Sequence, residues 1–282
     1  MALVFALNRI TTPLFACQLL VMLLALPAAG QAQSLNLASG AKDQPIEIIA
    51  DNGIEWQQEN EILIATGNAK ASRDGVSVKA EVLRAYYKQK SEGGADLYRM
   101  EAAGGVKIYS STDSIIGETA VYDFEKAILR VDGRKVIFKS GDNTISANQQ
   151  MEYWERQKMA VARGRAVAVH QGKTVRADIL KALIREKKDG KSEVYIVEAF
   201  DNVLIISEQD RVRADRGIYK VDSGIATLAG NITITRADSI LTGDQAEVNF
   251  KTGVSKLLTA EPVRSNVREK KRIRGLIYPQ NQ

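Results

Sequence analysis

Val76-Ser77-Val78-Lys79-Ala80-Glu81-Val82 alternates apolar or small side chains with polar ones. Successive side chains of a β-strand point to opposite faces, so this period of two predicts a strand with one buried and one exposed face. The alternation recurs at Val106-Lys107-Ile108, at Val212-Arg213-Ala214 and at Asn231-Ile232-Thr233-Ile234-Thr235. We therefore expect half-buried strands along much of the chain.

Short polar segments that contain Gly, Asp or Asn separate the expected strands. These residue types supply the positive φ angles that tight turns need. The segments are 73–75, 131–133, 140–143, 170–172, 188–190, 222–224 and 252–253. Short strands separated by such turns predict an all-β chain.

The distribution of proline also favours an all-β chain. All five prolines lie at positions 13, 27, 45, 262 and 279, so residues 46–261 contain none. Proline has no backbone N–H, and its absence leaves nearly every donor available to a β-ladder. A helical chain would also tolerate this absence, so the period of two decides between them.

A second regularity overlies the strands. A Gly or Asn that follows small or apolar residues recurs, and a segment centred on Ala follows each one roughly twelve to sixteen positions later. The first set is 65–68, 103–105, 131–133, 162–164, 199–202 and 228–231, and the second is 80–81, 120–121, 147–148, 177–178, 214–215 and 246–247. From Gly67 to Gly230 the mean spacing is about 33 residues, which is long for one β-helix turn and fits a repeated pair of hairpins. We predict a solenoid-like stack of antiparallel strands, with each Gly or Asn entering a turn.

These residues also carry a family resemblance. The first strand Pro45-Ile46-Glu47-Ile48-Ile49-Ala50-Asp51, the segments at 65–69 and 78–81, and a second unit at 103–108 and 117–123 resemble the LptA/OstA family of lipopolysaccharide transport proteins. The resemblance covers roughly residues 45–255. It implies an incomplete antiparallel β-jelly roll, open along one side, whose interior takes lipid acyl chains and whose ends pair with partners of the same fold. One extended jelly roll and two fused units both remain open.

An apolar interior suits lipid carriage on physical grounds. Burial of one methylene is worth about 0.8 kcal/mol, so a chain of a dozen methylenes needs a continuous apolar trough to leave a membrane. The residues that we predict to bind lipid are Ile46, Ile48, Ile62, Ile64, Val76, Val78, Val106, Ile108 and Phe138. The alternative is that these side chains form a dry, packed core.

The N-terminus predicts export. Arg9 precedes an apolar run from Leu14 to Leu26, and Pro27 is followed by small residues, as in a signal peptide at residues 1–32. A retained anchor helix is the alternative. Residues 33–44 then form a linker, 45–260 the β domain, possibly as two fused units, and 261–282 a basic C-terminal tail. Cys17 is the only cysteine and would leave with the signal peptide, which fits a periplasmic protein without disulfides.

The composition argues against an enzyme. One His and one Cys exclude metal centres that need several imidazoles or thiolates. His170 falls at an expected hairpin tip, where a solvated side chain is the usual outcome, and Trp56 and Trp154 are expected to be half-buried anchors. We find no Gly-rich phosphate loop or nucleophile motif, so we expect no cofactor and no catalytic residues.

The expected tail is strongly basic. Its charged residues between 264 and 274 are Glu269 and the six cations Arg264, Arg268, Lys270, Lys271, Arg272 and Arg274. In an exported protein nucleic acid is not an expected partner, and the phosphates of lipid A or an anionic membrane surface are better candidates. A solvated terminus is the alternative.

Together these features predict a periplasmic carrier that binds lipopolysaccharide through its lipid A and passes it from the inner to the outer membrane. The expected protein partners are the inner-membrane component at an edge around Ile46–Ala50, the outer-membrane component near Asn249–Leu258, and further copies end to end. The alternatives are an LptC-like anchored component of the same pathway, a secreted β-solenoid enzyme acting on polysaccharide, and an adhesive scaffold.

Overall fold

The computed structural model describes residues 45–91, 94–187, 192–208, 210–237, 239–258 and 273–276. The predicted signal peptide and linker, and most of the predicted basic tail, lie outside these residues. The described residues form eighteen β-strands and no α-helix, which confirms the all-β prediction. No apolar helix of membrane-spanning length occurs in the described part of the chain.

Every pairing between these strands is antiparallel. The strands are β1 (Glu47–Ile49), β2 (Gly53–Gln57), β3 (Ile62–Arg73), β4 (Val76–Gln89), β5 (Ala95–Tyr109), β6 (Asp113–Asp123), β7 (Ile128–Asp132), β8 (Val136–Ser140), β9 (Asn143–Ala147), β10 (Gln150–Trp154), β11 (Met159–His170), β12 (Lys173–Glu186), β13 (Ser192–Ile206), β14 (Asp210–Lys220), β15 (Ile225–Arg236), β16 (Ser239–Asn249), β17 (Val254–Leu258) and β18 (Arg274–Leu276).

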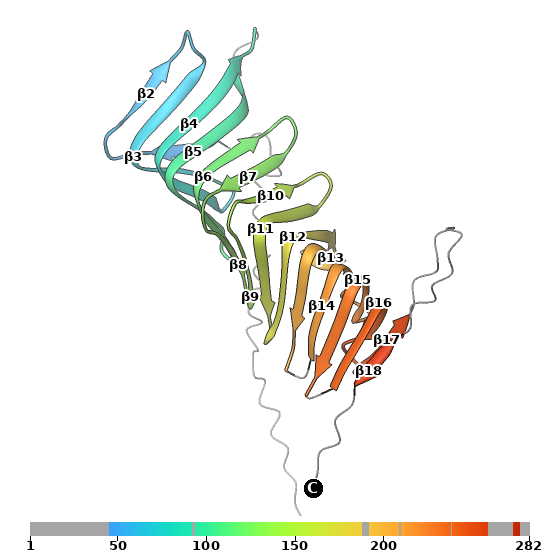
Figure 1. The fold of residues 1–282 in the computed structure, drawn as a ribbon. Helices are drawn as coiled ribbons and strands as arrows, with labels where there is room; N and C mark the ends of the chain where they lie inside the picture. The colour runs from blue at the N-terminus through green and yellow to red at the C-terminus, as the bar shows by residue number, and fades with distance from the viewer. Residues whose placement is uncertain are drawn as a thin grey trace, which may run out of the picture. The chain divides into compact units, whose positions relative to one another are not determined.

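Most strands pair with the next strand of the chain, so the colours of Figure 1 follow one another in order along the sheet. Four long strands pair on one side with two short strands, one on each half of their length. These are β3 with β1 and β2, β6 with β7 and β8, β11 with β9 and β10, and β16 with β17 and β18. Each long strand therefore contributes to two walls.

The two walls meet where the long strands bend. On β3 the pairing shifts between Thr66 and Ala69, so that Gly67 and Asn68 are bulged, with φ angles of 83° and 43°. Equivalent shifts fall at Gly104-Gly105, Gly164-Arg165, Asp201-Asn202 and Gly230-Asn231, all with positive φ. The sequence reading of these residues as turn entrances is wrong, because an extra pair of left-handed residues bends a strand without ending it.

The short strands β1, β8, β9 and β18, with the halves of the long strands that lie beside them, form what we call the β1 wall. The short strands β2, β7, β10 and β17, with the other halves of the long strands, form the β2 wall. Their inner faces pack together in one core of buried residues. Alanines line the bend from inside, among them Ala69, Ala80, Ala147, Ala166 and Ala177. A small side chain fits there because the walls converge, which explains the recurring Ala in the sequence.

The strand pattern repeats after 97 residues. β3 begins at Ile62 and β11 at Met159, and both are 12 residues long. The same offset relates β4 to β12, β5 to β13 and β6 to β14, each pair again with equal lengths. The predicted spacing of about 33 residues corresponds to one pair of strands within this longer repeat.

The C-terminal strands repeat the arrangement of β11. β17 pairs with the second half of β16, in the same way that the first half of β11 pairs with β10. β18 pairs with the first half of β16, in the same way that the second half of β11 pairs with β9. Arg274–Leu276 therefore belongs to the sheet, although the sequence placed it in a basic tail.

Candidate functional site

Seven of the nine residues that the sequence assigned to lipid lie on the inner faces. Val76, Val78, Val106 and Ile108 belong to the buried core, and Ile46, Ile48 and Phe138 are partly buried and pack against it. Their register agrees, since Val78 pairs with Ile108 and Ile108 with Ile115, which in turn pairs with Phe138. The structure brings these seven together along the β1 wall.

Ile62 and Ile64 fall outside this set. Ile64 is partly buried on the other face, and Ile62, although only 9% exposed, does not belong to the core cluster. On β4, Ile62 pairs with Tyr86 and Ile64 pairs with Arg84. The alternate residues Leu63 and Ala65 pair with Ala85 and Leu83, which are buried. The segment Ile62-Leu63-Ile64-Ala65 is apolar throughout, so its period does not reveal which side chains point inward. The bend at Gly67 is the signal that could have settled the register, because it fixes Ala65 and Ala69 inside.

The inner face of the β2 wall was missed by the sequence analysis. Its larger buried side chains are Leu83, Met100, Tyr122, Leu129, Met151, Leu180, Leu228 and Val248. Alternation in these segments is obscured by apolar residues on the outer face, such as Val121 and Val161. The apolar surface thus continues over both walls and through both repeats.

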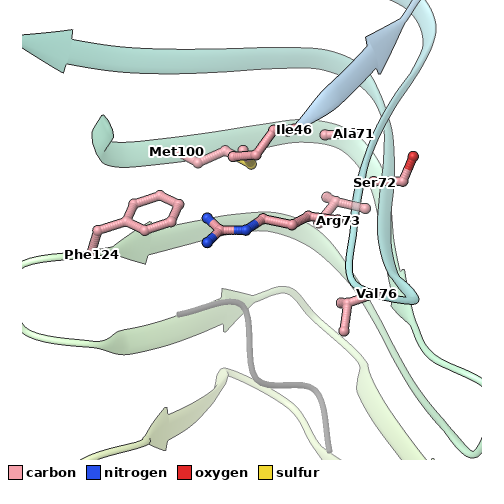
Figure 2. A pocket seen from close by; sticks show the side chains of 8 residues that line it. Ile46, Ala71, Ser72, Arg73, Val76, Met100 and Phe124 are labelled. Atoms are coloured by element: carbon pink, nitrogen blue, oxygen red, sulfur yellow. The ribbon is translucent and has the colours of Figure 1, made fainter. Parts of the chain in front are cut away.

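The described inner faces are tightly packed at the middle of the β1 wall. Val106 is 0% exposed and Ile108 1%. One apolar cavity of about 20 Å³ lies between the walls near the N-terminal end, lined by Ile46, Ala71, Ser72, Arg73, Val76, Val78, Met100 and Phe124 (Figure 2). This space holds about one water molecule, so an acyl chain would have to separate the walls.

The free rims of the two walls face each other along a line that we call the seam. At its C-terminal part Arg236, at the end of β15, donates to both oxygens of Asp210 at 2.7 and 2.9 Å and to the carbonyl of Gly253 at 3.1 Å. Asp210 and Arg236 belong to the β1 wall and Gly253 to the turn before β17. The Arg236 side chain therefore ties the rims together.

Two aromatic contacts lie along the rim of the β2 wall. The indole Nε1 of Trp56 donates to the hydroxyl of Tyr87 at 2.5 Å, and the Tyr122 ring meets that of Phe124 edge-on at 4.6 Å between centroids. Burial, with the nearby Glu155 carboxylate, raises the pKa of Tyr122. Tyr122 therefore remains a neutral, largely apolar part of the inner face.

His170, Trp56 and Trp154, for which the sequence predicted no chemical role, take different positions in the sheet. His170 is exposed at the end of β11, and Trp154 is partly buried on the outer face of β10. Trp56 differs from expectation, since it is 61% exposed. In the described part of the chain no group of three His, Cys, Asp or Glu side chains is placed to hold a metal ion.

Both ends of the sheet present open edges. Among the described strands β1 and β2 pair only with β3, and β17 and β18 only with β16. Large apolar side chains are exposed at these ends, Ile49, Ile54 and Trp56 at one and Val254, Leu258 and Leu276 at the other. An open edge with apolar side chains is a surface on which another strand can pair.

Comparison with known proteins identifies relatives. The family model described as "LptA/(LptD N-terminal domain) LPS transport protein" matches residues 47–158 and again 144–254, and the two matches begin 97 residues apart, as the strands do. An uncharacterised protein of Rhizobium meliloti (strain 1021) is 29% identical over 161 residues, which cover 54% of this chain and 86% of that protein. The crystal structure of LptH, the LptA-homologous periplasmic component of the lipopolysaccharide transport device of Pseudomonas aeruginosa, is similar at 15% identity and a TM-score of 0.41, over 49% of this chain and 95% of that one.

Proposed function

The chain belongs to the LptA/(LptD N-terminal domain) family of LPS transport proteins, and from this we propose that it is a periplasmic carrier that holds the acyl chains of lipopolysaccharide between its two walls. The family consists of transport proteins, which agrees with the prediction that the chain is not an enzyme. One observation supports the proposal above all. The inner faces form a continuous apolar surface through both repeats.

The lipid-facing residues of this proposal are the seven inner ones, Ile46, Ile48, Val76, Val78, Val106, Ile108 and Phe138, together with side chains of the β2 wall such as Leu63, Met100 and Leu129. Since these inner faces are tightly packed, binding exchanges contacts between the walls for contacts with acyl chains. Each buried methylene contributes about 0.8 kcal/mol, so a dozen supply on the order of 10 kcal/mol toward separating the walls.

The two ends carry the proposed protein contacts. The edge of β1 and β2 docks on the inner-membrane component of the pathway, the edge of β17 docks on the outer-membrane component, and copies of the chain pair end to end. Unpaired strand edges with exposed apolar side chains support these contacts. With them the protein passes lipopolysaccharide across the periplasm, and nucleic acid has no part in it.

Photo-crosslinking in cells tests the lipid-binding face. Crosslinkers at Ile48, Val78 and Ile108 should capture lipopolysaccharide, whereas crosslinkers at the outward-facing neighbours Glu47, Lys79 and Lys107 should not. Crosslinkers at Ile64 and Leu63 make a further matched pair, with capture expected only at Leu63. Equal capture from both faces would refute the proposed interior site.

A further inference from the structure

Three lysines stand in register on the outer face of the β1 wall. Lys70 on β3 pairs with Lys79 on β4, and Lys79 pairs with Lys107 on β5. These strands are neighbours in the sheet (Figure 1), so the three positions follow one another at strand spacings of about 4.8 Å. Lys79 follows the buried Val78 and Lys107 precedes the buried Ile108, so the three side chains point outward. We call Lys70, Lys79 and Lys107 the lysine row.

Both ends of the lysine row are apolar. Ile49 on β1 pairs with the first lysine, and Ile116 on β6 pairs with the third. Their side chains are 53% and 43% exposed. Within the described residues none of the three lysines takes part in an ion pair. The row is therefore a local concentration of positive charge that the fold does not neutralise.

An aromatic ring lies against the row. The Nζ atoms of Lys79 and Lys107 lie 5.8 and 5.4 Å from the centroid of the Tyr109 ring. Tyr109 pairs with Ser77 and Ser114, so it belongs to the same outer face. A ring attracts a cation without neutralising it. Tyr109 therefore adds amphipathic surface to the row and leaves its charge in place.

The carboxylates around the row have other positions or partners. Glu47 accepts a hydrogen bond from the Ser72 hydroxyl at 3.3 Å, and Asp51 accepts one from the Asn68 amide at 2.8 Å. Glu81 lies in the bend of β4, where the pairing with β5 is interrupted. These groups leave the centre of the row with one sign of charge.

The outer face of the β2 wall is organised differently. There Arg130 contacts Asp132 at 2.9 Å, and Lys181 contacts Glu198 on the neighbouring strand at 3.0 Å. Cations on that face thus have carboxylate partners. The unneutralised row is a feature of the β1 wall.

The fold does not require three lysines at these positions. Like charges directly opposite one another on adjacent strands are destabilising. After 97 residues the same three positions hold Val167, Arg176 and Leu204, which pair in the same order. Lysine can also guard a sheet edge, but β3, β4 and β5 each have paired strands on both sides. The row is therefore specific to the first repeat and is unfavourable for folding.

The chemistry of the row and its surroundings fits the surface of an anionic bilayer. Ammonium groups are compact point charges that attract phosphates without fixed geometry. Tyrosine is enriched at the head-group level of membranes, and exposed aliphatic side chains such as Ile116 gain free energy there. A soluble polyanion would use the cations alone. The combination favours a lipid surface.

We propose that the lysine row and Tyr109 bind the head groups of anionic phospholipids, so that the outer face of the β1 wall lies against a membrane in the first repeat. The row begins beside β1, whose edge is the proposed docking edge for the inner-membrane component. The membrane contact adds to the proposed function and does not depend on the binding of lipopolysaccharide.

Vesicle binding by the purified exported protein tests this. The probes are vesicles of phosphatidylglycerol with phosphatidylcholine, and vesicles of phosphatidylcholine alone, at about 0.15 M salt. Lys70→Gln, Lys79→Gln and Lys107→Gln combined should weaken binding to the anionic vesicles about a hundredfold, since each lysine contributes about fivefold. The thermal stability of this triple variant should equal or exceed that of the unmodified protein, because repulsion between the strands is removed. Tyr109→Ser should weaken binding about fivefold.

Lys181→Gln, Lys220→Gln and Lys256→Gln combined are the matched control. These lysines lie on the outer face of the β2 wall, and their removal changes the net charge equally. Binding should stay within about twofold of that of the unmodified protein, because distant charges are screened. All variants keep residues 261–282, so any contribution of that basic segment is common to them.

Equal losses in the two triple variants, or no loss when the lysine row is removed, overturn the proposal. Equal binding of the unmodified protein to both kinds of vesicle also overturns it. Inorganic polyphosphate that binds as tightly as the anionic vesicles, with no effect of Tyr109→Ser on either, overturns the lipid surface in favour of a soluble polyanion. The vesicles contain no lipopolysaccharide, so each of these outcomes leaves the proposed carriage of lipopolysaccharide to its own test.

Discussion

The side-chain amide of Asn231, in the bend of β15, donates to the carboxylate of Asp215 on the neighbouring strand β14 at 2.8 Å. Asn202 and Asp178 make the same contact at 2.7 Å on β13 and β12. In both cases the Asn has positive φ, and its amide joins the bulge to the neighbouring strand. The bends are thus tied by a recurring Asn–Asp hydrogen bond.

The corresponding bend of β5, Gly104-Gly105, allows a sharp test. A Cβ on Gly104 would lie 2.6 Å from the Cβ of Glu81, whereas a Cβ on Gly105 would meet nothing within 4 Å. Both have positive φ, which Asn tolerates better than most residues. We expect Gly104→Ala to lower the free energy of unfolding by about 1–3 kcal/mol and Gly105→Asn to change it by less than about 0.5 kcal/mol. Urea unfolding measures both, and equal losses would contradict this account of the bend.

The tie at the C-terminal part of the seam should contribute to stability. Asp210→Asn removes the charge that holds Arg236, and we expect a loss of about 1–3 kcal/mol in the free energy of unfolding. Glu247→Gln is the control, because Glu247 pairs with Lys256 at 3.8 Å in an exposed position. That change should cost less than about 0.5 kcal/mol. Similar losses for the two variants would show that the seam is not held by Arg236.

Buried tyrosine should make the protein sensitive to alkali. Burial and the Glu155 carboxylate raise the pKa of Tyr122, so the unfolded chain ionises this group first, near its ordinary value of about 10. The stabilisation is complete below that pH and is lost as the pH rises toward the folded-state value, at up to about 1.4 kcal/mol per pH unit. Tyr122→Phe should show a shallower fall in unfolding free energy above pH ~10. Tyr219→Phe should show less benefit, since burial is the one cause that raises the pKa of Tyr219.

A charge on the N-terminal edge should block docking. Ile49 is 53% exposed on β1, and lysine on an edge strand is a common means of preventing strand addition. We expect Ile49→Lys to abolish capture of the inner-membrane partner in a pull-down and leave stability within about 0.5 kcal/mol. Ile116→Lys, an exposed apolar position on the central strand β6, should keep full capture. Loss of capture in both variants would point to a general charge effect and away from the β1 edge.

The accuracy of the sequence-based predictions varied with the local pattern. Regular alternation predicted the strand at Val76–Val82 and its buried face as far as Ala80. Beyond the bend the register shifts, so that Leu83 is buried in place of Val82. Ile62–Ala65 did not reveal its inward face, since every residue there is apolar, and only the pairing with β4 decides it. The double left-handed bulge at Gly67-Asn68 has the same residues as a tight turn, so sequence alone could not distinguish a bend within a strand from its end.

The repeat was visible in the sequence only in part. Its spacing of about 33 residues follows from glycines at alternate strands, and the 97-residue unit becomes evident when strand lengths are compared. The cavity near the N-terminal end could not be predicted, because the two walls that form it come from residues 46 to 124 and meet only when the strands bend.

The matching pairing of β17 and β18 on β16, and of β11 on β10 and β9, has a consequence for evolution. β17 and β18 therefore begin a further copy of the unit, so the surface that the first unit offers to the second recurs after β16. Duplication or deletion of a whole 97-residue unit in the gene would leave both terminal edges unaltered. Such a scaffold can grow or shrink in fixed increments without any new recognition surface having to arise.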